Sequence, residues 1–220
     1  MKRRFQTMQS RHFLLQHTSI LTFVSVLVLM GVVFGAIVVN SLQIEQREDL
    51  FGYVSQFFQQ FSAGQLADPN NLFTQSAWDN AKTIGLMWLL GISVVGVPVV
   101  LFFLFIKGIV LGFTVGFLVG EMGWEGVWIT TLSILPQNIL LLPIFVGVGA
   151  SAVLVSFRMV RKQFTKTQEP MWPLFRQYTL ILGGALLLVV VAAGVEAYVS
   201  PQFLQTLNLP SFAGLGVGKQ

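Results

Sequence analysis

Long stretches without a charged residue constrain this chain more than any other feature. In residues 20–39, twenty consecutive positions hold no Asp, Glu, Lys or Arg. The hydrocarbon core of a bilayer is about 30 Å thick, and a helix of roughly 20 apolar residues crosses it. Only 10% of the 220 residues are charged and 54% are hydrophobic, whereas soluble domains carry about 25% charged residues. The sequence therefore predicts a helical membrane protein and all but excludes a water-soluble globular enzyme.

Five segments are predicted to span the membrane as an all-α, multipass helical bundle in one domain, 1–220. They are 20–39, 83–106, 108–120, 128–157 and 178–199. The first follows a short basic N-terminus without a small-residue cleavage site, so we interpret it as a retained signal anchor. The second and third are separated only by Lys107 and are predicted to form a tight hairpin. Pro136 and Pro143 should kink or break the fourth, because proline removes a backbone donor.

The basic residues predict the orientation of this bundle, since cytoplasmic loops are enriched in Lys and Arg. Five spans and a cytoplasmic N-terminus place these residues inside: Lys2, Arg3, Arg4, Arg11, Lys107, Arg158, Arg161, Lys162, Lys166 and Arg176. Only Arg47, Lys82 and Lys219 fall outside. The loop 40–81 and the tail 200–220 are then extracytoplasmic. Orientation thus explains the net charge of +4, and no nucleic-acid partner is predicted.

The residue types that catalysis and metal binding need are scarce. The chain has no cysteine, and its two histidines, His12 and His17, precede the first predicted span. Disulfides, thiolate metal sites and cysteine nucleophiles are therefore excluded. The sequence also lacks the Gly-x-Ser-x-Gly, His-Glu-x-x-His and Walker motifs. We predict no enzymatic activity, no catalytic residues, no metal and no cofactor.

A glycine ladder marks the third predicted span, where every fourth residue is glycine: Gly108, Gly112, Gly116 and Gly120. Such a stripe lets another backbone approach closely, which is how membrane helices associate. Gly31-x-x-x-Gly35 and Gly147-x-x-x-Ser151 offer matching small faces. Packing within the chain is the favoured interpretation, and a homodimer or partner seam is the alternative.

The predicted outer loop contains an amphipathic helix. Its apolar residues recur at helical spacing: Leu50, Phe51, Val54, Phe57, Phe58 and Phe61. The other face carries Arg47, Asp49, Gln56, Gln59 and Gln60. We favour a helix lying in the lipid interface, and the alternative is a docking face for an extracytoplasmic protein. Downstream, Asp68-Pro69-Asn70 predicts a turn and cap for a helix that continues through Trp78.

Polar groups at membrane depth are costly, so each is a functional hypothesis. Gln137 and Asn138 lie beside Pro136 and are predicted to satisfy carbonyls that the prolines leave free. A substrate or ion site in a broken helix is the alternative, with partner contact as a third interpretation. Glu121 and Glu196 lie near the outer boundary, where solvated carboxylates at helix ends are favoured over a proton relay.

Three blocks resemble the stage II sporulation protein M family over most of the chain. They are Phe105-Ile106-Lys107-Gly108 with the glycine ladder, Leu135-Pro136-Gln137-Asn138-Ile139 with Pro143, and Glu196-Ala197-Tyr198-Val199-Ser200-Pro201. Many broader relatives carry Pro-His-Gly where this chain has Pro136-Gln137-Asn138, so the chain sits with the sporulation branch. That departure cautions against carrying over any histidine-based activity.

The resemblance implies a non-enzymatic membrane scaffold of endospore-forming bacteria. In such a role it recruits stage II sporulation proteins D and P, which degrade peptidoglycan, to the mother-cell septal and engulfing membrane. The outer amphipathic helix is then a candidate docking face. The alternative function is a small oligomeric transporter or channel, whose broken fourth helix and glycine-rich third helix line a path.

Overall fold

The computed structural model describes residues 2–62, 68–93, 95–164 and 172–199, and these ranges are helical almost throughout. The elements are α1 (Lys2–Val39), α2 (Ile44–Ser62), α3 (Pro69–Gly91), α4 (Gly96–Ile129), the π-helical turn η1 (Thr130–Ile134), α5 (Leu135–Phe164), α6 (Trp172–Gly194) and the π-helical turn η2 (Val195–Val199). No strand occurs in these ranges. The all-α prediction is confirmed.

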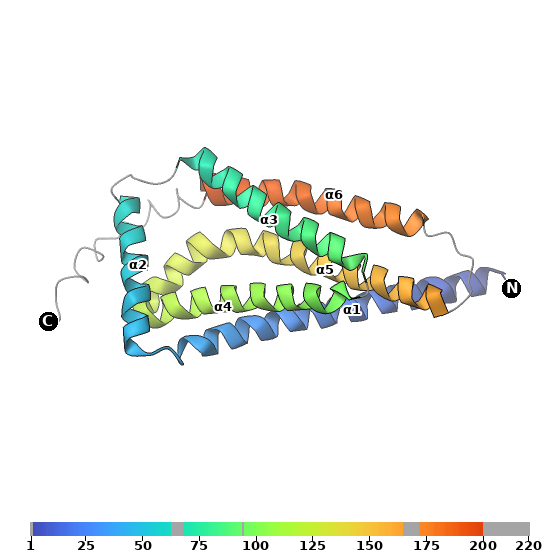
Figure 1. Ribbon diagram of the computed structural model, residues 1–220, viewed down its shortest axis with the longest axis horizontal. Coiled ribbons are helices and arrows are strands. Elements are labelled where there is room, and N and C mark those ends of the chain that lie inside the picture. Colours follow the sequence, from blue (N-terminus) through green and yellow to red (C-terminus); the bar gives the residue numbers. More distant parts are fainter. Residues whose placement is uncertain (1, 63–67, 94, 165–171, 200–220) are drawn as a thin grey trace.

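Five long helices form the bundle, and one helix crosses its end. Figure 1 shows α1, α3, α4, α5 and α6 running along the long axis of the molecule, while α2 lies across one end. Helix α1 begins at the end far from α2, and α6 begins at that far end and returns toward α2. The buried core is apolar and draws side chains from all five long helices, such as Val24, Ile84, Leu104, Val148 and Val189.

Three segments are long and apolar enough to cross a membrane: Thr18–Val39, Gly96–Arg161 and Leu174–Tyr198. The second has 66 residues, which far exceeds one crossing. Gly123 interrupts its helical geometry with φ 56°, a backbone conformation that glycine adopts readily. The chain turns back there, so that α4 and α5 run side by side in opposite directions (Figure 1). The protein is therefore a helical membrane protein.

The predicted hairpin with its turn at Lys107 is wrong. The break comes earlier, between Gly91 and Gly96, and Lys107 lies inside α4. A single lysine does not stop a helix, because lysine is a good helix former. Pro98 does not stop it either, since it occupies the first turn of α4, where a backbone N–H has no intrahelical partner to lose. Segments 83–106 and 108–120 are thus the end of α3 and most of α4.

The proline-containing fourth segment is distorted but continuous. The N–H of Leu135 bonds to the carbonyl of Thr130, one residue farther back than in an α-helix. This wider turn directly precedes Pro136, whose ring would clash with the preceding helical turn. Pro143 lies inside α5, which arches along the bundle in Figure 1. The segment is therefore kinked rather than broken.

The glycine ladder lies against α1. A Cβ built on Gly112 would overlap the carbonyl oxygen of Val32, and one on Gly108 would overlap that of Val28. At Gly116 the nearest atom is the Cα of Ala36, at 3.1 Å. Gly31 and Gly35 meet α4 in the same way from the other side. At Gly120 and Gly147, apart from neighbours in the same helix, no atom of the described chain lies within 4 Å of a built Cβ.

Candidate functional site

One ion pair ties α2 to the end of the bundle. The Arg47 guanidinium lies 3.3 Å from Oε1 of Glu121, which belongs to α4. A second guanidinium nitrogen of Arg47 donates to the carbonyl of Val39 at 3.3 Å, where α1 ends. Glu121 is thus paired rather than a solvated carboxylate, and the predicted exposure of this residue is wrong. These contacts hold α2 across the bundle end seen in Figure 1.

Helix α2 presents a polar face to its surroundings. Its exposed polar side chains include Glu45, Gln46, Glu48, Asp49, Gln56, Gln59 and Gln60. Of the predicted docking residues, Leu50, Phe51 and Val54 are half-buried. Phe57, Phe58 and Phe61 lie in α2, but their side chains fall outside the described part of the structure. The structure therefore brings these six residues onto one helix without showing what that face contacts.

We expect Arg47→Gln to loosen α2 without unfolding the bundle. The variant loses the pair with Glu121. Both side chains stay partly in contact with solvent, 34% and 23% exposed, and such a pair stabilises a protein by about 1 kcal/mol. Hydrogen exchange should therefore become faster in α2 and stay unchanged in α4. Lys82→Gln is the matched control, because it removes the 3.1 Å pair with Asp79 inside α3. Equal exchange rates in α2 for both variants would contradict the anchoring role of Arg47.

The second cluster lies inside the bundle and centres on Glu196. Ser76 of α3 and Gln137 of α5 both donate to Oε2 of Glu196, the latter at 2.5 Å. Asn80 then donates to the Ser76 carbonyl at 3.0 Å. The start of α3 is fixed by its cap, in which the N–H of Asn70 donates to Asp68 as predicted, and Tyr198 donates to the Asn70 side chain at 3.0 Å. These bonds join α3, α5 and η2.

Two sequence predictions about these residues are wrong. Glu196 is not a solvated carboxylate, because it is half-buried and accepts from two other helices. Gln137 does not serve its own helix, since its amide donates to Glu196. Asn138 alone stays local, donating to the Ile134 carbonyl at 2.8 Å. The partners of Glu196 are far away in the sequence, so spacing along the chain could not reveal them.

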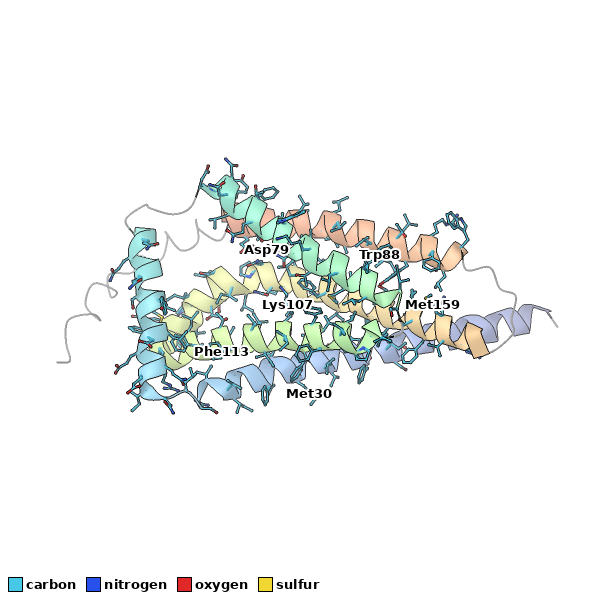
Figure 2. All side chains as sticks on the ribbon, viewed as in Figure 1. Met30, Asp79, Trp88, Lys107, Phe113 and Met159 are labelled. Carbon is cyan, nitrogen blue, oxygen red and sulfur yellow. The ribbon has the colours of Figure 1, made fainter. Side chains whose placement is uncertain are left out.

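Lys107 is the least expected member of the bundle interior. It lies 11 residues from the start of α4 and 16 from the bend at Gly123, which is about 17 Å and about 24 Å of helix. Figure 2 places it near the middle of the bundle, with Asp79 on neighbouring α3. Its ammonium nitrogen is 4.9 Å from the centroid of the Phe145 ring. Lys107 therefore lies inside a helix and not in the predicted loop between two helices.

A polar cavity surrounds this lysine. It has a volume of about 160 Å³ and is lined by apolar residues of α4, η1 and α5 together with five polar residues: Asn80, Lys107, Thr114, Gln137 and Asn138. Gln137 connects the cavity to Glu196. Neither Ser76 nor Asn80 was predicted to lie at a site. Lys107 was predicted between two helices, although a lysine between two long uncharged stretches was a signal for an interior position.

Two more side chains missed by sequence reasoning secure the break between α3 and α4. Ser156 of α5 donates to the carbonyls of Gly91 and Ser93, at 2.8 and 3.1 Å. Tyr178 of α6 donates to the Trp88 carbonyl at 2.9 Å, and its ring stacks on that of Trp88 at 5.6 Å. Carbonyls at a helix end need such partners. The break is thus stabilised from α5 and α6.

The clusters around Arg47 and Glu196 consist of polar side chains that join one helix to another. In the described ranges no group of three or more His, Cys, Asp and Glu residues could hold a metal ion. No curated protein and no solved structure was found to match the chain. The family described as Stage II sporulation protein M matches residues 24–201, which include α2, the glycine ladder and the Glu196 network. Because this match covers most of the 220 residues, the chain belongs to the stage II sporulation protein M family.

Proposed function

We propose that this protein is a non-enzymatic scaffold that recruits the peptidoglycan-degrading stage II sporulation proteins D and P. Its membership in the stage II sporulation protein M family supports a sporulation-related role in the membrane. The observation that carries the scaffold role is the position of α2, an amphipathic helix held across the end of the bundle by Arg47 and Glu121. A helix in this position offers a surface beside the membrane rather than inside it.

Charge supports an extracytoplasmic position for α2. The end of α5 carries Arg158 and Arg161, and the first turns of α6 carry Arg176, all at the end of the bundle far from α2. Helix α2 itself is acidic at its start, with Glu45, Glu48 and Asp49 exposed. Basic residues mark the cytoplasmic side. We propose that α1, α3, α4, α5 and α6 each cross the membrane, so that α2 faces the compartment that contains peptidoglycan.

In this proposal the bundle is the anchor and α2 is the docking element. The candidate contacts are the apolar residues of α2 from Leu50 to Phe61, which the sequence pattern groups on one face. The mother-cell septal and engulfing membrane is the proposed location. The protein then acts by concentrating hydrolases where the wall is to be removed.

The expected result of changing Phe57 and Phe61 to Asp is the loss of hydrolase binding. Two buried carboxylates in an apolar contact are strongly unfavourable, so the affinity should fall by more than about a hundredfold, which corresponds to about 2.8 kcal/mol. The measurement is gentle-detergent purification of the tagged protein from sporulating cells, with co-purifying proteins identified by mass spectrometry.

The matched control is Gln56→Asp with Gln60→Asp, which adds the same charge on exposed positions of α2. This control should retain proteins D and P. Both variants should remain in the membrane fraction in normal amounts. Retention of both hydrolases by the Phe57/Phe61 variant would refute this docking face, and their absence from the native preparation would refute the scaffold role.

A further inference from the structure

Lys107 needs an acceptor that the described chain does not place in contact with it. It interacts electrostatically with Asp79 and Glu196, but no carboxylate in the described ranges lies within 4.0 Å of it. Asp79 is paired with Lys82 at 3.1 Å, and Glu196 accepts from Ser76 and Gln137. The Lys107 ammonium lies over the face of the Phe145 ring. A ring face offers no oxygen acceptor to the three N–H donors of the ammonium.

In the proposed topology, in which α4 crosses the membrane, Lys107 lies well away from both membrane surfaces. About 17 Å of helix separates it from the nearer end of α4, which is longer than its four-carbon stem. Isolated charges at this depth are costly and are usually paired. The cavity beside the ammonium, about 160 Å³, is large enough for a carboxylate group as well as for water.

The cavity is bordered by surface that faces the surroundings of the bundle. Val110, which lines it, is 57% exposed, and Ile139, next to the lining residue Asn138, is 64% exposed. Acyl chains at this position offer no hydrogen-bond acceptor, and lipid head groups lie at the membrane surface. An occupant that reaches this depth from the lipid side and satisfies the ammonium is therefore a membrane-spanning helix.

We propose that the cavity around Lys107 is a docking position for a transmembrane helix of another protein that carries an Asp or Glu near its centre. Charge complementarity selects the carboxylate, which accepts from the Lys107 ammonium. A second copy of this chain is a poor occupant. Among the acids of its described membrane helices, Asp79 is paired with Lys82 and Glu121 with Arg47. Glu196 is held by two donors, and Glu125 follows the bend at the outer end of α4.

This docking position is separate from the face on α2. The proposed scaffold role rests on contacts outside the membrane, whereas Lys107 acts within it. Substitutions at Lys107 therefore test this inference, and the Phe57/Phe61 variant tests the scaffold role. A negative result in one of these tests leaves the other proposal unaffected.

The test uses the purified full-length protein in lipid vesicles with designed leucine-rich transmembrane peptides. Three peptides differ only in the central residue, which is Asp, Leu or Lys, and energy transfer measures their association with the protein. Interhelical hydrogen bonds in membranes correspond to roughly fivefold to thirtyfold in association. The Asp peptide should therefore bind at least about fivefold more tightly than the Leu peptide, and the Lys peptide should bind least.

Three variants assign this difference to the lysine. Lys107→Met should remove the preference for Asp, and Lys107→Arg should retain it. Arg176→Met, an exposed position on α6 outside the cavity, should leave it unchanged. Thermal unfolding of each variant reports whether the bundle is intact. Equal binding of the Asp and Leu peptides, or a preference that survives Lys107→Met, would overturn the proposal.

A second measurement covers the case in which a designed peptide packs poorly. A photo-crosslinking residue at Val110 is compared with one at Leu187, which is 68% exposed on α6. The Val110 adduct should contain a membrane segment with an acidic residue and should vanish with Lys107→Met. An adduct without an acid, or one that persists in Lys107→Met, would contradict the inference. So would chloride or glycerol flux through vesicles that Lys107→Met abolishes, because the cavity would then be a solute path.

Discussion

Gly112→Ala is expected to destabilise the protein by about 3 kcal/mol, the upper end of the usual cost of overpacking. A Cβ at this position would overlap the Val32 carbonyl oxygen, and its two next neighbours are also backbone atoms of Val32. Backbone atoms cannot move aside as a flexible side chain can. Helices α1 and α4 would have to separate along their contact, which lies at the centre of the glycine ladder. The measurement is unfolding of the purified protein in a mild detergent on titration with a denaturing one.

Gly120→Ala is the matched control from the same ladder. No described atom lies within 4 Å of its built Cβ, so the methyl group has room. Alanine is also the better helix former, and this variant should be about 0.5–1 kcal/mol more stable than the native protein. If both variants behaved alike, the close approach of α1 and α4 could not be what stabilises the bundle.

The second large effect is expected for Gln137→Leu. This change keeps the size of the side chain but removes a donor to the half-buried Glu196 carboxylate. Hydrogen bonds to charged groups contribute about 1.5–3 kcal/mol, so a loss in that range is expected in the same unfolding assay. Asn138→Leu removes a neutral bond from α5 to the adjoining turn η1 and should cost about 0.5–1.5 kcal/mol.

A double-variant cycle checks the physical cause of this loss. Replacing both Gln137 and Glu196 with Leu removes the unpaired carboxylate along with its donor. The pair should therefore cost less than the sum of the two single changes. Strict additivity, or a smaller loss for Gln137→Leu than for Asn138→Leu, would show that the Gln137–Glu196 bond does not stabilise the bundle.

The all-α class was predictable because its cause is local. A run such as 20–39 must satisfy its backbone groups within itself to enter lipid, so composition alone dictates helices. The amphipathic spacing in α2 and the cap at Asp68 are local as well, and both predicted elements agree with the structure. The glycine ladder likewise predicted a close helix contact, although the spacing of the glycines did not identify α1 as the partner helix.

The break between α3 and α4 was not predictable in the same way. The turn there depends on Ser156, which lies more than 60 residues away in the sequence. Its hydroxyl donates to the carbonyls of Gly91 and Ser93. A Cβ on Gly91 would overlap the Tyr178 hydroxyl and Ala152, so the glycine is required by α6 and α5 rather than by the turn alone. The uncharged run that begins at Thr83 ends at Lys107, which is why the boundary was predicted there.

The Glu196 network escaped prediction for a related reason. Ser76 lies 120 residues and Gln137 lies 59 residues from Glu196, and only the folded bundle brings them together. The sequence indicated that Gln137 and Glu196 are unusual for their surroundings. It did not indicate that the Gln137 amide donates to the Glu196 carboxylate.

The orientation of α2 is the claim on which the scaffold account depends most directly. Because the chain has no cysteine, single cysteines can be added without further changes. Gln56 is exposed on α2, and Trp172 is 77% exposed at the start of α6. We expect a membrane-impermeant maleimide to label Gln56→Cys in intact protoplasts, and to label Trp172→Cys only after the membrane is opened. Labelling of Trp172→Cys in intact protoplasts, with Gln56→Cys protected, would place α2 in the cytoplasm and contradict the account.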